Sequence, residues 1–207
     1  MDSPREIRDG EEFALETLKT YLLENNINAD DLSIKQFPSG YSNLTYFLKS
    51  SSEEFVLRRP PFGAKSLQGG HDMFREYNVL KNLKSQFLKV PDVYLYCDNS
   101  EIIGAPFYLM ERVKGYIIRP NLQQKDSPGK EVIQNVSKSL VSTLVELHNV
   151  DIDQANLNEL GNINGYVKRQ VEGWIKRYNH SKTDSIENME FIACLLYTSP
   201  SPRDKSS

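Results

Sequence analysis

Residues 37–59 read FPSGYSNLTYFLKSSSEEFVLRR, and this stretch decides the fold. It holds two apolar segments, Leu44–Lys49 and Phe55–Arg59, which contain the β-branched and aromatic residues that favour strands. The polar residues 50–54 separate the two segments over a length that suits a turn. We therefore expect a β-hairpin, preceded by a weaker strand over residues 32–37.

The loop before this hairpin, residues 39–43, consists of small polar side chains around Gly40. A glycine lets the backbone approach a ligand closely. The second arm of the hairpin ends in the cation Arg58, which the strand holds beside the loop. A backbone loop next to a fixed cation is what the phosphates of a nucleotide require, so the pattern indicates a phosphate-binding site.

The rest of the first half predicts two helices and two more strands. Their apolar residues recur at the helical period or at the strand period. The expected elements are a helix over residues 11–25, a helix over residues 71–87, and strands over residues 93–97 and 106–113 with a polar turn over residues 98–104 between them. Together with the strand over residues 32–37 and the hairpin, these two strands predict a five-stranded antiparallel sheet with a helix packed on it.

Glu76 lies on the apolar stripe of the helix over residues 71–87. Burial of an unpartnered carboxylate is costly, so Glu76 needs a cation or hydrogen-bond donors. Arg58 and Arg59 are the nearest cations in the expected fold. Two interpretations stay open at this point: an ion pair with one of these arginines, or a solvated glutamate at the edge of the stripe.

The second half of the chain is helical in pattern. Residues 130–149 carry an apolar stripe, and residues 166–178 and 187–196 follow with further helical periods. Residues 197–207 are polar, contain proline and have no periodicity, so we expect disorder there. The segment from Cys194 onward resembles the translation of a sequencing-adapter read-through, which predicts that the native reading frame ends near Ala193.

Composition narrows the class of protein. The chain has 207 residues, 39% hydrophobic and 26% charged, which fits a globular domain or part of a larger one. A formal net charge of -3 gives no electrostatic reason to expect a nucleic acid or a membrane as partner. Cys97 and Cys194 form no Cys-x-x-Cys pattern, which argues against a disulfide framework or a zinc site. We see no signal peptide and no membrane span, and we expect a cytoplasmic protein.

Seven short segments, in colinear order between Ile34 and Trp174, resemble the aminoglycoside-phosphotransferase-like family of kinase-fold proteins. The branch that they resemble most is the one also found fused to acyl-CoA dehydrogenases. Each segment is weak alone, but the order makes the resemblance specific. The segments are GYSNLTY at 40–46, FVLRRP at 55–60, REYNVL at 75–80, PDV at 91–93, FYLME at 107–111, LHNVD at 147–151 and VKRQVEGW at 167–174.

The resemblance implies an α+β, protein-kinase-like fold. Residues 1–113 would form the antiparallel N-lobe with its helix, residues 114–193 a linker and the first helices of an incomplete α-helical C-lobe, and residues 194–207 a non-native tail. In this family Arg58 takes the place of the strand lysine that contacts the phosphates, and Glu76 would pair with it. The hinge at the adenine would span Tyr108–Val113. The residues implied to bind the nucleotide are Ser39, Gly40, Tyr41, Ser42, Asn43, Arg58 and Glu76, together with Met110, Glu111 and Val113 of this hinge.

The family also implies ATP and Mg²⁺ as cofactors and a hydroxyl group of a small molecule as acceptor. Its fusion branch suggests a coenzyme A ester as one class of acceptor. The family's His-Gly-Asp catalytic loop, its following Asn and its later Asp for Mg²⁺ have no match here, so we assign no catalytic residue and no metal ligand. We expect the ATP-binding portion of a phosphotransferase that is inactive alone; the alternative is a non-catalytic nucleotide-binding or scaffolding module.

Overall fold

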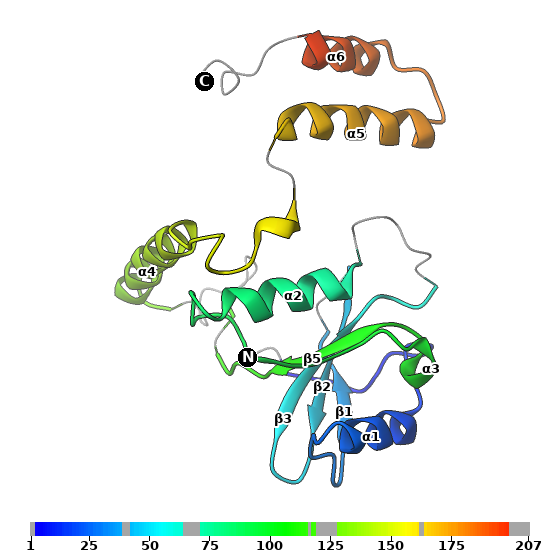
Figure 1. Ribbon diagram of the computed structural model, residues 1–207, viewed down its shortest axis with the longest axis vertical. Coiled ribbons are helices and arrows are strands. Elements are labelled where there is room, and N and C mark those ends of the chain that lie inside the picture. Colours follow the sequence, from blue (N-terminus) through cyan, green and yellow to red (C-terminus); the bar gives the residue numbers. More distant parts are fainter. Residues whose placement is uncertain are drawn as a thin grey trace. The chain divides into compact units, whose positions relative to one another are not determined.

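The structure is a computed structural model, and it describes residues 3–38, 42–63, 71–115, 117–118, 128–161 and 164–198 (Figure 1). The chain divides into two compact units, Met1–Leu157 and Asn158–Ser207. The first unit contains the sheet and the helices α1 to α4. The second contains the short 3-10 helix η2 (Asn158–Leu160), α5 (Tyr166–Ser181) and α6 (Glu187–Thr198).

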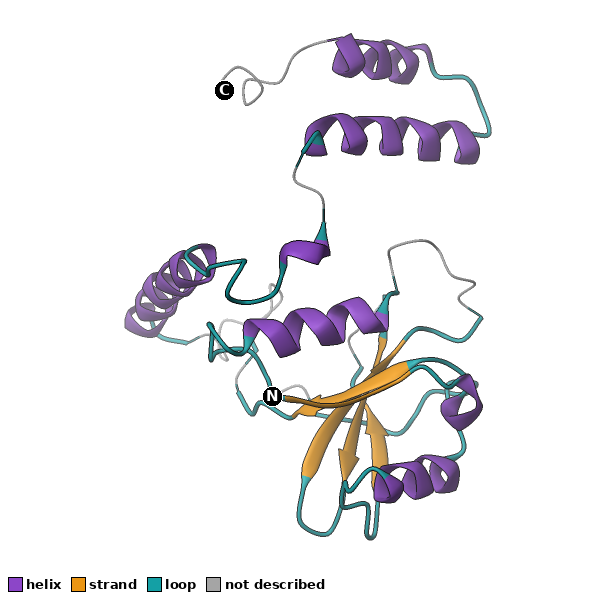
Figure 2. Cartoon of the chain, viewed as in Figure 1, coloured by secondary structure: helices purple, strands orange, loops and turns teal. Residues whose placement is uncertain are grey.

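The first unit is built on an antiparallel sheet of five strands in the order β1-β2-β3-β5-β4 (Figure 2). All four strand pairs are antiparallel. The predicted antiparallel five-stranded sheet is therefore confirmed, and the hairpin β2–β3 lies at its centre. The strands are β1 (Ser33–Gln36), β2 (Leu44–Lys49), β3 (Glu54–Arg59), β4 (Val93–Cys97) and β5 (Phe107–Glu111).

Helices cover both faces of this sheet (Figure 1). On one face, α1 (Leu15–Glu24) buries Leu18 and Leu22 against strand residues that include Leu57 and Leu109. On the other face, α2 (Met73–Leu83) packs against β4 and β5. The cluster of buried apolar residues lies on the α1 face, where each fully buried aliphatic side chain contributes about 1.5–3 kcal/mol to stability.

One predicted turn is wrong. Residues 98–104 form a short helix, α3 (Ser100–Ile103), in place of a polar turn. The side chain of Asn99 caps it by accepting a hydrogen bond from the backbone N–H of Glu101, and Gly104 ends it with a left-handed φ of 81°. The helix buries Ile103 in the core. One helical turn is too short to show an apolar period, so the sequence pattern could not reveal it.

Two helix ends also differ from the sequence expectation. α1 begins at Leu15 instead of residue 11, because Glu11 accepts hydrogen bonds from Arg8 and Gln36, which fix the preceding segment beside β1. α6 extends through Thr198, two residues past the predicted helix 187–196, so residues 197 and 198 are helical where the sequence predicted disorder. The rest of the predicted tail, residues 199–207, lies outside the described residues.

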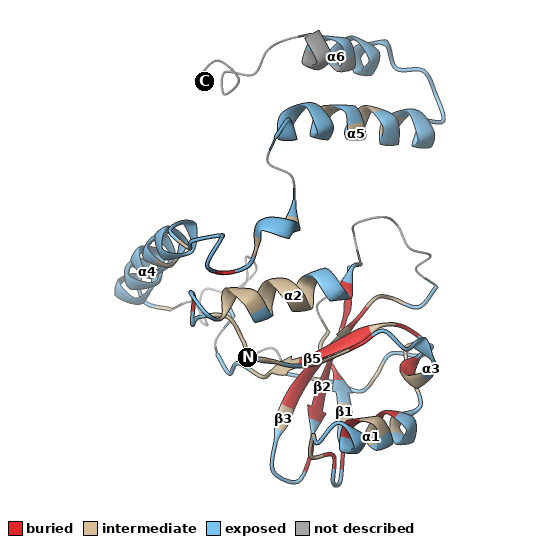
Figure 3. Ribbon diagram, in the orientation of Figure 1, coloured by how far each residue is buried: buried red, intermediate tan, exposed pale blue. Residues whose placement is uncertain are grey.

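The helix α4 (Lys130–His148) has no buried residue (Figure 3). The predicted helix is present, but its apolar face is exposed: Leu140 is 68% exposed and Leu144 is 48% exposed. In the second unit, Trp174 on α5 and Phe191 on α6 are 65% and 68% exposed. Among the described residues, none of the helices is both long and apolar enough to span a membrane.

Candidate functional site

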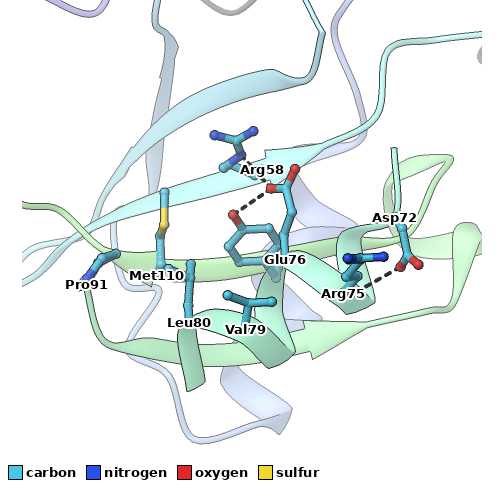
Figure 4. A pocket seen from close by; sticks show the side chains of 9 residues that line it. Arg58, Asp72, Arg75, Glu76, Val79, Leu80, Pro91 and Met110 are labelled. Atoms are coloured by element: carbon cyan, nitrogen blue, oxygen red, sulfur yellow. Dashed lines mark hydrogen bonds and ion pairs between the residues drawn. The ribbon is translucent and has the colours of Figure 1, made fainter. Parts of the chain in front are cut away.

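A cavity of about 570 Å³ lies between α2 and the sheet (Figure 4). It is polar toward the start of α2 and apolar further along the helix. The charged residues that line it are Arg58, Asp72, Arg75 and Glu76, and the apolar ones are Val79, Leu80, Pro91 and Met110. A cavity with an apolar wall and a few convergent charged groups is the usual form of a small-molecule site.

The alternation of side chains along β3 selects Arg58 over Arg59 for this cavity. Arg58 stands opposite Tyr108 in the β3–β5 register, and successive side chains of a strand point to opposite faces. Arg58 therefore faces α2, and its Nε lies 3.2 Å from Oε2 of Glu76. Arg59 faces the other side, where its Nη1 donates a hydrogen bond of 2.6 Å to the carbonyl of Ile103.

The carboxylate of Glu76 connects α2 to three strands. Its Oε1 accepts a hydrogen bond of 2.8 Å from Nδ2 of Asn43, the residue directly before β2. Its Oε2 accepts one of 2.9 Å from the hydroxyl of Tyr108 on β5 and also contacts Arg58 on β3. Glu76 is thus partnered, yet its side chain keeps 34% exposure at the cavity. Of the two interpretations of Glu76, the structure contains the ion pair.

Arg58 is held at one end only. Its Nε is buried and donates no hydrogen bond, so the contact with Glu76 is an ion pair without directed hydrogen-bond geometry. Among the described residues, its two terminal nitrogens have no partner. A guanidinium that is anchored on one side and unpaired on the other can donate two parallel hydrogen bonds to an oxyanion.

Tyr108 supplies a neutral donor to this group. Its ring is 2% exposed, and burial raises the pKa of its hydroxyl well above the usual value. Arg58 lowers this pKa in part, while the nearby Glu76 carboxylate raises it further. The hydroxyl therefore stays protonated at any physiological pH and can keep donating to Glu76. Tyr108 entered the sequence prediction only as the first residue of the hinge.

The predicted phosphate loop is only partly described. Ser39, Gly40 and Tyr41 lie outside the described residues, and Ser42 is exposed. Asn43 is 4% exposed, and both ends of its side-chain amide form hydrogen bonds, with Glu76 and with His71. His71 was absent from the sequence-based assignment. No sequence signal marks it, because its contact with Asn43 depends on how β2 and α2 meet in three dimensions.

The three predicted hinge residues do not behave alike. Met110 lines the cavity. Glu111 turns to the neighbouring strand, where its carboxylate accepts a hydrogen bond of 3.1 Å from the backbone N–H of Asp92. Val113 is 65% exposed on the segment after β5. The structure therefore brings Met110 to Arg58 and Glu76, and it leaves the side chains of Glu111 and Val113 outside the cavity.

No cluster of three or more His, Cys, Asp or Glu side chains that could hold a metal ion occurs within the described ranges. The polar end of the cavity carries two cations, Arg58 and Arg75. Two carboxylates, Asp72 and Glu76, balance them. The side chain of Asp72 accepts a hydrogen bond from the backbone N–H of Arg75 and thereby caps α2.

Comparisons with known proteins agree on one family. The model of the phosphotransferase enzyme family, APH, matches residues 33–204. Acyl-CoA dehydrogenase family member 11 of Rattus norvegicus is 38% identical over 196 residues, which cover 92% of this chain and 25% of that protein. Family member 10 of Mus musculus is 33% identical over 189 residues, 90% of this chain and 17% of that protein. This chain thus spans a quarter or less of the length of these two relatives.

A crystal structure from Ralstonia eutropha, assigned as an aminoglycoside phosphotransferase, superposes with a TM-score of 0.70. Its sequence is 27% identical, and the match covers 93% of this chain and 55% of that one. The predicted kinase-like architecture is confirmed by this likeness. The predicted resemblance to the branch fused to acyl-CoA dehydrogenases is confirmed as well, by the relatives above.

Proposed function

The chain belongs to the phosphotransferase enzyme family, and from this premise we propose that its first unit binds the phosphates of ATP at the cavity beside α2. The observation that carries the proposal is Arg58, a half-buried guanidinium anchored by Glu76 with its terminal nitrogens unpaired among the described residues. Phosphate oxygens suit a guanidinium better than an ammonium where two parallel hydrogen bonds are needed. Arg58 would thus contact the phosphates in place of the strand lysine of the family.

The residues present fit a nucleotide. Arg58 would hold a phosphate, Arg75 would add positive charge at the cavity mouth, and the apolar wall that includes Met110 and Leu80 would receive an uncharged group. ATP supplies the phosphoryl group that the family transfers. For Mg²⁺ the fit is poor among the described residues, which contain no cluster of metal-ligating side chains. We therefore derive no step through the metal from this chain's own residues.

We propose further that the chain binds the nucleotide without transferring its phosphoryl group. Transfer requires a base that accepts the proton of the acceptor hydroxyl and groups that hold Mg²⁺ at the phosphates. The three histidines are His71, His148 and His180, and none has an aspartate two residues later. Binding by itself needs only the cation, its anchor and the cavity, which this unit contains.

As a second ligand of the chain we propose a small molecule with a hydroxyl group, the acceptor class of the family, with a coenzyme A ester as the class to test first. Two relatives are acyl-CoA dehydrogenase family members. The second unit carries a basic stretch on α5, with the pairs Lys168–Arg169 and Lys176–Arg177. Such cations would suit the phosphates of a coenzyme A moiety. The test is titration of the chain with a coenzyme A ester, followed by NMR of the backbone amides. Shifts of the α5 resonances would support this class of ligand, and unchanged α5 resonances would refute it.

The test of nucleotide binding compares two arginine variants. Arg58→Gln removes the proposed phosphate contact, and we expect it to weaken Mg-ATP by about tenfold or more, the value of a charge-assisted hydrogen bond. Arg8→Gln is the matched control, because Arg8 also places its Nε on a glutamate, Glu11, at 2.8 Å, but on the N-terminal segment beside β1. Displacement of a fluorescent nucleotide by ATP, ADP and adenosine reads out affinity. Equal affinity of wild type and Arg58→Gln for ATP would refute the site.

A further inference from the structure

Asn43 joins His71 to Glu76 by hydrogen bonds, and Glu76 forms the ion pair with Arg58, the proposed phosphate cation. Its Nδ2 donates to Glu76 at 2.8 Å, and its Oδ1 lies 2.7 Å from Nδ1 of His71. Glu76 in turn contacts Arg58 at 3.2 Å. These contacts join the residue before β2, the segment before α2 and the strand β3. Neither Asn43 nor His71 lines the cavity.

Elementary hydrogen-bond chemistry fixes the proton on His71. An ionised carboxylate only accepts, so the amide of Asn43 must turn its NH₂ group toward Glu76. Its carbonyl oxygen then faces His71, and a carbonyl also only accepts. Nδ1 of His71 must therefore carry a hydrogen, whether the ring is neutral or protonated. The opposite amide orientation would place two acceptors against each other at the Glu76 contact.

We propose that Asn43 and His71 are positioning residues for Glu76 and, through it, for the guanidinium of Arg58, with His71 held in its Nδ1–H form. The part concerning nucleotide affinity rests on the function proposed above, whereas the Nδ1–H form does not. Oε2 of Glu76 serves two partners, Tyr108 and Arg58. Oε1 has Asn43 as its donor. The Asn43 contact therefore fixes the rotation of the carboxylate plane, which sets where Arg58 is anchored.

Burial supports a positioning role over an incidental surface contact. Asn43 is 4% exposed, so a wrong amide orientation would leave its polar atoms unpaired away from water. Its two partners lie 28 and 33 residues away in sequence, His71 and Glu76 respectively. Both groups of the amide are thus hydrogen-bonded to side chains far away in the sequence, so Asn43 connects separate elements of the fold. It ties β2 to α2 at the end where Arg58 meets Glu76.

The first test measures the proton position and needs no nucleotide. The full chain is labelled with ¹⁵N in its histidines, of which there are three. We expect His71 to show the hydrogen on Nδ1 when neutral, whereas the exposed rings of His148 and His180 should favour Nε2–H as free histidine does. In Asn43→Ala the preference of His71 should disappear. A neutral His71 with its hydrogen on Nε2 would overturn the proposal.

The second test uses the shapes of two amides. In His71→Asn the nitrogen of the introduced amide would occupy the place of Nδ1, whereas the longer side chain in His71→Gln places its nitrogen near Nε2. We expect His71→Asn to bind Mg-ATP within about threefold of wild type, and His71→Gln and Asn43→Ala to bind it about tenfold more weakly. A purely structural role would instead lower the stability of these variants and leave their affinity unchanged. His180→Gln, on the exposed end of α5, is the control.

The two proposals fail in different ways. If His71→Gln and Asn43→Ala bind Mg-ATP like wild type while Arg58→Gln does not, the positioning role is refuted and the nucleotide site stands. If Arg58→Gln binds like wild type, the nucleotide site is refuted, and with it the effect of Asn43 and His71 on affinity. The Nδ1–H form of His71 would still be decided by the histidine spectra.

Discussion

Replacement of Glu76 by alanine should destabilise the first unit far more than loss of an ordinary ion pair. The change removes the acceptor of two buried donors, the side chain of Asn43 at 4% exposure and the hydroxyl of Tyr108 at 2%. An unsatisfied buried donor costs about 1–3 kcal/mol. Because water can fill the space at the cavity, we take the lower end for each donor. The ion pair with Arg58, whose side chains are 31% and 34% exposed, adds up to about 1 kcal/mol, for a total of roughly 2–3 kcal/mol.

Two matched variants test this magnitude. Glu146→Ala breaks an ion pair of 2.6 Å with Lys89, but both partners are about half exposed, so it should cost less than about 1 kcal/mol. Glu76→Gln keeps one acceptor for Asn43, and the hydroxyl of Tyr108 can turn to accept from the new amide. We expect its loss of stability to lie between those of the two alanine variants.

The assay is urea denaturation followed by near-ultraviolet circular dichroism of the tyrosines. Fluorescence of the single tryptophan is unsuitable, because Trp174 belongs to the second unit and does not report on the sheet. The free energy of unfolding is compared at an unchanged denaturant slope. If Glu76→Ala loses no more stability than Glu146→Ala, the carboxylate does not join α2 to the strands, and the reasoning about the site is wrong.

Three other predictions concern stability, pH and association. Arg59→Met should cost about 1–3 kcal/mol in the same urea assay, because it removes a buried hydrogen bond to a backbone carbonyl; an unchanged midpoint would contradict this. Burial raises the pKa of Tyr46 to about 12, so its contribution to stability is complete below pH 10, where the unfolded side chain is still neutral, and is lost as pH rises toward 12. Tyr46→Phe should lose less stability than wild type as the pH of the urea assay rises through this window, and equal losses would contradict the shift. Because Leu140 and Leu144 expose apolar surface on α4, we expect the chain to self-associate, and Leu140→Lys combined with Leu144→Lys should reduce that association in sedimentation velocity; equal association in wild type and variant would contradict it.

Much of the fold could be predicted because its elements carry long or alternating apolar patterns. The β2 boundaries agree with the sequence expectation, and α4 differs from it by one residue at its end, Asn149. Short elements failed for a physical reason: α3 contains one turn, which has no period to detect. The start of α1 was predicted too early for a different reason: Glu11 accepts a hydrogen bond from Gln36, which lies 25 residues away in the sequence.

The candidate site shows the same division. The strand period could have separated Arg58 from Arg59, because their side chains must point to opposite faces of β3. Composition and spacing identified Glu76 as a carboxylate in need of a partner. They could not assign Asn43 to Glu76, or reveal His71 at all, because these contacts depend on how β2 and α2 meet in three dimensions.

The central claim is that the first unit binds nucleotide phosphates through Arg58. Isothermal titration of the full chain with Mg-ATP tests it most directly, in parallel with Arg58→Gln at the same protein concentration. We predict saturable binding at a single site by the wild-type chain and an affinity about tenfold or more lower for the variant. Absence of saturable binding by the wild type, or the same affinity in both proteins, would contradict the claim.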